Sequence, residues 1–113
     1  LDCLPARQFV RTPHGWAERV VVMDEAERLA FALRPAQAPA TAEAPLGAVC
    51  ELSERQAQFA RELAGRVLAQ DGYALLIDYG RERPEPGDTL QALRRHEKVD
   101  PLADPGACDL TVW

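Results

Sequence analysis

The feature that most constrains the fold is a helical pattern followed at once by an apolar run. Ser53 is a typical N-cap, and Gln56 three residues later gives the spacing of a capping box. Apolar residues then recur at helical spacing as one stripe: Phe59, Ala60, Leu63, Ala64, Val67 and Leu68. The pattern predicts an amphipathic helix over 53–71, ended by Gly72, where a left-handed conformation costs little.

The apolar run occupies residues 73–79, Tyr-Ala-Leu-Leu-Ile-Asp-Tyr. A nearly continuous apolar segment of this length is typical of a strand buried on both faces, as in a parallel sheet. A helix, a short turn and a buried strand make half of a βαβ unit. We therefore expect an α/β fold rather than an all-β one.

The first third of the chain has a different pattern. Short alternating or β-branched runs at 7–11, 16–23 and 28–33 are separated by turn residues at 12–15 and 24–27. They predict a three-stranded antiparallel meander, although residues 29–33 could instead form a short helix. We divide the chain into a meander (1–36), a Pro/Ala loop (37–52) and a core region (53–113), with short strands expected at 89–93 and from 109 onward.

Bulk composition excludes several functions. The net charge of −5 argues against a nucleic-acid binder, and no apolar run approaches the roughly 20 residues that span a bilayer. The three cysteines are far apart, so neither a zinc site nor a disulfide framework is expected. The chain contains no G-x-S-x-G nucleophile elbow, which disfavours an α/β-hydrolase, and it contains no G-x-G-x-x-G motif.

Candidate chemistry lies at the end of the expected strand. Ligands of open α/β sheets bind beyond the carboxyl ends of the strands, where Asp78, Tyr79 and Gly80 stand. Asp78 could orient a polar group, Tyr79 could contact a ligand, and Gly80 would permit close approach. The alternative is purely structural: Asp78 caps a turn, Tyr79 packs, and Gly80 supplies a positive φ. His96, in a charged segment, is either a cleft residue or a surface residue.

Three stretches in order resemble one family. Residues 1–10 with the Gly-Trp turn at 15–16 are similar to its Asp-Ala-Leu-Pro-Val motif and the strand that follows. Residues 72–80 match its G-x-x-L-x-x-D-Y-G strand. Residues 88–92, His96 and 105–111 resemble its D-T … H … P-G-x-x-D-[LI]-T tail. The family is MidA, S-adenosylmethionine-dependent methyltransferases that include the mitochondrial complex I assembly methyltransferase.

The resemblance implies the C-terminal part of a doubly wound, Rossmann-like methyltransferase sheet with the meander as an antiparallel insertion. It also implies S-adenosyl-L-methionine as cofactor and protein arginine as acceptor. Methyl transfer depends mainly on positioning, and carboxylates could orient a guanidinium. On this basis Asp2, Asp78 and Asp109 are the expected catalytic residues, and Tyr79, Gly80, His96 and Thr111 the expected substrate-binding residues.

The departures from the family pattern carry expectations too. The Gly-rich loop and the acidic residue for the ribose are missing, so the cofactor-binding residues are unknown and this chain alone should be inactive. Both ends look cut.

Expected partners are an acceptor protein such as a respiratory complex subunit and a second copy of the chain, with no nucleic acid, metal or membrane span. We expect a bacterial cytoplasmic location; the resembling eukaryotic members are mitochondrial. The competing hypothesis is a non-enzymatic assembly factor with a methyltransferase-like fold.

Overall fold

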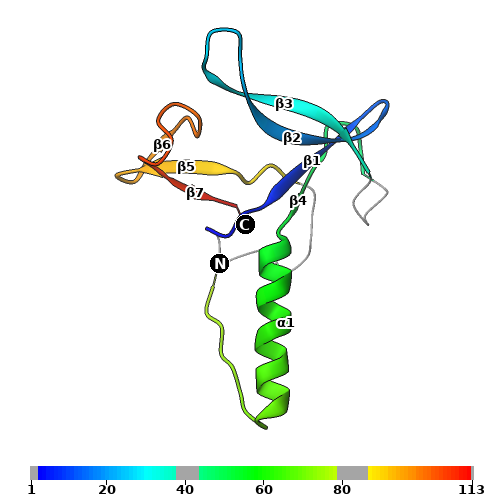
Figure 1. Ribbon diagram of the computed structural model, residues 1–113, viewed down its shortest axis with the longest axis vertical. Helices are drawn as coiled ribbons and strands as arrows, with labels where there is room; N and C mark the ends of the chain where they lie inside the picture. Colours follow the sequence, from blue (N-terminus) through cyan, green and yellow to red (C-terminus); the bar gives the residue numbers. More distant parts are fainter. Residues whose placement is uncertain (1–2, 38–43, 79–86, 113) are drawn as a thin grey trace.

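The computed structural model describes residues 3–37, 44–78 and 87–112. In this part of the chain two antiparallel sheets and one long helix form an elongated molecule of 55 × 37 × 21 Å. Figure 1 shows the helix α1 projecting away from both sheets. The fold is mixed α/β, as the sequence predicts.

The larger sheet has the strand order β3-β2-β1-β4, with all neighbours antiparallel. Its strands are β1 (Arg7–Thr12), β2 (Gly15–Met23), β3 (Leu29–Ala36) and β4 (Val49–Leu52). The predicted meander is confirmed, and the alternative of a helix at 29–33 is wrong. The predicted loop at 37–52 ends in β4, because these four residues complete the ladder along the free edge of β1.

The core of this sheet is small and comes from few side chains. Phe9, Trp16, Ala17 and Val49 are its buried apolar residues among those described. The β2–β3 turn closes on Asp24, whose carboxylate accepts hydrogen bonds from the backbone N–H groups of Ala26 and Arg28. Cys3, Cys50 and Cys108 form no disulfide.

The helix α1 spans Glu54–Ala69 and begins as predicted. Ser53 is the N-cap, and its Oγ accepts a hydrogen bond from the backbone N–H of Gln56. The predicted end is wrong in detail: the left-handed residue is Asp71 (φ 47°), not Gly72, since Asp tolerates this region better than most residues. No residue of α1 is buried. Within the described part, no helix is both long and apolar enough to cross a bilayer.

The segment after α1 departs most from the prediction. Residues 73–78 form no strand, and the described part of the chain offers no strand that pairs with them. Leu75 is 86% exposed and Ile77 is 90% exposed. An inner strand needs hydrogen-bonding neighbours at both edges and a packed layer on each face, and here it has neither. The segment runs back along α1 instead (Figure 1).

The smaller sheet has the order β6-β5-β7 and is also antiparallel. It contains β5 (Gln91–Arg94), β6 (Glu97–Val99) and β7 (Asp109–Thr111), so both expected C-terminal strands are present, the first shifted by about two residues. Arg95 and His96 connect β5 to β6 with φ of 53° and 68°, the geometry of a two-residue hairpin turn. Ala92 packs at the centre and is only 2% exposed.

Candidate functional site

The predicted site residues are spread over several elements. Asp2, Tyr79 and Gly80 lie outside the described residues. Asp78 is exposed at the end of the extended segment that follows α1. The expected placement of Asp78 at the tip of an inner strand is therefore not met within this chain.

The three remaining predicted residues belong to the smaller sheet. Asp109 opens β7 opposite Leu93 and lines a hollow of about 310 Å³ together with Arg94 and Arg95. His96 is exposed in the β5–β6 turn. Thr111 is buried, and its Oγ has no hydrogen-bond partner within the described residues. The structure brings Asp109, His96 and Thr111 onto one sheet, and Asp78 onto a different element.

Another group of polar residues is brought together closely, and the sequence did not single it out. Gln8, Arg19 and Glu51 come from β1, β2 and β4, and Asp88 and Thr89 come from the segment that leads into β5; we call these five residues the junction cluster. Gln8 Nε2 donates to Glu51 Oε1 at 2.6 Å and to Asp88 Oδ1 at 2.9 Å. Arg19 Nη1 donates to Asp88 Oδ2 at 2.7 Å and to Gln8 Oε1 at 3.0 Å.

The strand register explains this geometry. Gln8 stands directly opposite Arg19 on one side and Glu51 on the other, so the three side chains share one face of the sheet. Glu51 then accepts from the backbone N–H and the hydroxyl of Thr89. The junction cluster thereby attaches the lead-in of the smaller sheet to the larger sheet.

The polar groups of the junction cluster bind one another, so the cluster is suited to holding the two sheets together rather than to catalysis. Both carboxylates and the guanidinium are engaged by partners inside the cluster, and Gln8 and Thr89 are buried. A general acid or base needs a side chain that is free to exchange a proton with a substrate, whereas each of these groups is already held by a partner in the cluster. We therefore assign the cluster to positioning the two sheets. Its only signal in the sequence is Asp88-Thr89, which belongs to the family motif; the cross-strand partners depend on the register.

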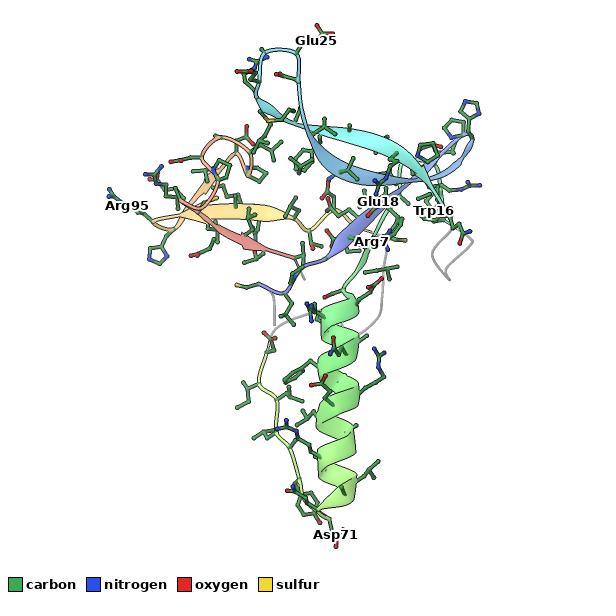
Figure 2. The ribbon with its side chains drawn as sticks, in the orientation of Figure 1. Arg7, Trp16, Glu18, Glu25, Asp71 and Arg95 are labelled. Carbon is green, nitrogen blue, oxygen red and sulfur yellow. The ribbon has the colours of Figure 1, made fainter. Side chains whose placement is uncertain are left out.

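A second polar group lies on the opposite face of the larger sheet. Glu18 accepts from Arg7 Nε at 2.7 Å and from Arg34 Nη2 at 2.9 Å, and its side chain is 11% exposed. Hydrogen bonding to Arg7 first, and to Arg34 second, lowers the pKa of Glu18 to about 2 despite the opposing effect of burial. Figure 2 shows Arg7 and Glu18 side by side, close to the buried Trp16.

The described residues do not form a binding site for S-adenosylmethionine. A Rossmann-type site uses a glycine-rich turn from a strand into a helix. The described strand-to-helix connection runs from β4 through Ser53 to α1 and has no glycine. The N-terminus of α1 is also capped by Ser53 and carries the carboxylate of Glu54. No part of this chain that the structure describes therefore fits the cofactor.

Comparison with known proteins decides the family. All of residues 1–113 match the model of a family described as "Putative S-adenosyl-L-methionine-dependent methyltransferase". The chain belongs to this methyltransferase family. The family's cofactor is S-adenosyl-L-methionine, as expected from the sequence motifs.

Curated relatives carry a more specific name. "Protein arginine methyltransferase NDUFAF7, mitochondrial" of Rattus norvegicus is 35% identical over 121 residues, and that of Homo sapiens is 33% identical over 115 residues. The match covers 97% of this chain and 26% of each relative. This family member thus spans about a quarter of the length of the curated relatives it matches.

A solved structure confirms the fold of the segment. A protein of Burkholderia thailandensis, solved bound to S-adenosyl-homocysteine, is 26% identical with a TM-score of 0.69. The similarity covers 98% of this chain and 32% of that protein. The two sheets and the helix are therefore a recurring part of a methyltransferase fold.

Proposed function

We propose that the protein takes part in methyl transfer from S-adenosylmethionine to an arginine of a partner protein. The observation that carries this proposal is the match of the whole chain to the methyltransferase family, together with arginine methyltransferase relatives at 33–35% identity. A respiratory complex I subunit is the proposed acceptor, because the family that the sequence motifs resemble includes the mitochondrial complex I assembly methyltransferase. We further propose a bacterial cytoplasmic location and a second copy of the chain as an additional partner.

We propose that residues 1–113 have two tasks, which are to hold the two sheets in place and to contact the acceptor. The junction cluster fixes the two sheets relative to each other, and the apolar face of residues 73–77 offers an inner strand to a larger sheet. Asp78 and Asp109 remain the proposed carboxylates that orient the guanidinium, together with Asp2. Tyr79, Gly80, His96 and Thr111 remain the proposed substrate contacts.

A chimera tests the proposal on a scaffold with a demonstrated ligand. Residues 1–113 would replace the matching segment of the Burkholderia thailandensis protein, which was solved with S-adenosyl-homocysteine. We expect the chimera to bind S-adenosylmethionine in calorimetry and to transfer labelled methyl groups to an arginine-containing protein. Transfer only to lysine, or to no protein at all, would contradict the proposed acceptor.

Asp78→Ala in the same chimera tests the proposed site. Loss of a carboxylate that orients the acceptor should reduce kcat/KM by about 100-fold, in the range found for positioning and general-base groups. Asp71→Asn is the control, because it removes an acidic side chain at the far end of α1 (Figure 2) and keeps a residue that tolerates the left-handed conformation found there. Equal rates in the two variants would remove Asp78 from the site.

A non-enzymatic assembly factor is the second candidate. It is favoured by one observation: the described residues do not fit the cofactor. If the chimera folds but neither binds S-adenosylmethionine nor transfers methyl groups, while it still retains a partner protein, this second candidate replaces the first.

A further inference from the structure

The β2–β3 hairpin carries an apolar strip that the proposed function does not use. Five alternating residues of one face, Val21, Met23, Leu29, Phe31 and Leu33, are between 36% and 62% exposed. The register pairs Val21 with Phe31 and Met23 with Leu29, so these side chains form one continuous surface. A contiguous exposed apolar surface on a sheet is typical of an interaction site.

The strip leads into a hollow at the tip of the hairpin. The hollow has a volume of about 630 Å³ and lies between the β2–β3 turn and the loop that connects β6 to β7. Its apolar lining comes from both sides: Met23 and Leu29 from the hairpin, and Leu102, Ala103 and Pro105 from the loop. This volume is within the range of clefts that bind ligands and can accept one or two side chains of a bound segment.

The lining of the hollow carries more negative than positive charge, which favours a positively charged ligand. Asp24, Glu27 and Asp100 line the hollow, against Arg28 as the one basic lining residue. The Asp24 carboxylate is engaged by Arg28 and by two backbone N–H groups. Within the described residues Glu27 and Asp100 form no ion pair, so their negative charges remain available to a ligand.

We infer that this hollow docks a segment of the acceptor protein in which arginine is flanked by apolar residues. Carboxylates hold a guanidinium through paired, charge-assisted hydrogen bonds, while the apolar floor and strip accept the flanking side chains. The inference rests on the proposed function for the identity of the acceptor. None of the four predicted site residues that the structure describes lines the hollow. We therefore assign the hollow to selecting the protein rather than to the methyl-transfer step.

A peptide-binding experiment tests the docking site directly. The probe is a fluorescent peptide with two arginines between leucine and phenylalanine, and the matched peptide carries glutamine in place of both arginines. We expect the 113-residue chain to bind the arginine peptide more tightly, with a difference that shrinks as salt is raised. Equal binding of both peptides would overturn the inference.

Substitutions locate the binding. Glu27→Gln with Asp100→Asn removes both charges and keeps side-chain size, and Asn can still accept the hydrogen bond from Leu102 N–H. We expect about tenfold weaker binding, the effect of losing two partly exposed charge pairs. Glu25→Gln is the control, since Glu25 is in the same turn but does not line the hollow and points outward at the tip (Figure 2). An equal loss in both variants, or in neither, overturns the docking site.

The methylation assay on the chimera separates this inference from the proposed function. If the double variant loses peptide binding and the chimera does not methylate, the docking site stands and only the proposed function fails. If the double variant binds the peptide normally, the docking site is wrong whatever the assay shows. If both proposals are right, the double variant of the chimera shows a raised KM and an unchanged kcat.

Discussion

The larger sheet and the α1 region differ in how far they bury their apolar side chains and pair their charged ones. The sheet of β1–β4 buries Phe9 and Trp16 and engages most of its charged residues in two polar groups, one on each face. Helix α1 buries nothing, and the apolar residues 75–77 after it are exposed. The larger sheet thus has a buried core and paired charges, although the apolar strip on its β2–β3 hairpin stays exposed. The α1 region has no buried residue in its helix, and its apolar surface fits a neighbouring element.

The largest expected effect lies in the core of the larger sheet. Trp16 is 7% exposed and packs where β1 and β2 meet, so Trp16→Ala should lower the free energy of unfolding by about 3–5 kcal/mol. Chemical denaturation followed by circular dichroism measures this loss. Leu68→Ala, at an 82% exposed position of α1, is the matched control and should change stability by less than about 0.5 kcal/mol. Equal losses of stability in the two variants would contradict the difference between the larger sheet and the α1 region.

The junction cluster comes next. Gln8→Ala leaves Glu51, Asp88 and Arg19 without their shared partner, and buried hydrogen bonds to charged groups contribute about 1.5–3 kcal/mol. We expect a loss of about 2 kcal/mol in denaturant unfolding, together with faster hydrogen exchange in β5. If exchange in β5 stays unchanged, the cluster does not couple the two sheets.

The start of α1 should respond less. Ser53→Ala removes the cap on the Gln56 N–H and the hydrogen bond from Ser53 Oγ to the carbonyl of Pro5, at a cost of about 1 kcal/mol. Because α1 has no buried residue, we expect the loss to appear as reduced helicity while β1 and β2 remain protected. Helix loss accompanied by global unfolding would show that α1 and the sheet form one cooperative unit.

The smallest effect is pH-dependent and is confined to the Arg7–Glu18–Arg34 group. The pKa of Glu18 is lowered to about 2 in the folded protein from an ordinary value of 4.5. A carboxylate with a depressed pKa stabilises the fold above its ordinary value, and this contribution is lost as the pH falls from about 4.5 to about 2. Stability of the wild type should therefore fall more steeply over that range than stability of Glu18→Gln. Parallel pH profiles would contradict the assigned ion pairs.

Local elements could be predicted well from the sequence, because their signals are local. The alternation in residues 7–33 and the cap at Ser53 depend on neighbours a few positions away, and the structure confirms both. The family motifs were sufficient to identify the methyltransferase family. At the end of the helix the choice of Asp71 over Gly72 as the left-handed residue was missed, since both residues tolerate that conformation.

Features that depend on distant partners were not predictable. The junction cluster requires the registers of three strands, so Gln8, Arg19 and Glu51 show no joint pattern in the sequence. The apolar run at 73–77 is typical of a buried strand, but residues 73–78 form none, because burial needs neighbours that the described residues do not supply. Among the predicted carboxylates, the placement of Asp78 depended on that strand, and in the structure Asp78 belongs to a different element from Asp109 in β7.

The most direct test of the central claim measures one substitution in two contexts. Ile77→Asp is introduced into the 113-residue chain, where Ile77 is 90% exposed, and into the chimera with the Burkholderia thailandensis protein. We predict a change below about 0.5 kcal/mol in the chain and a loss of more than about 3 kcal/mol in the chimera, where an unpaired charge would be buried. Equally small changes in both would contradict the claim that residues 73–77 become an inner strand of a methyltransferase sheet.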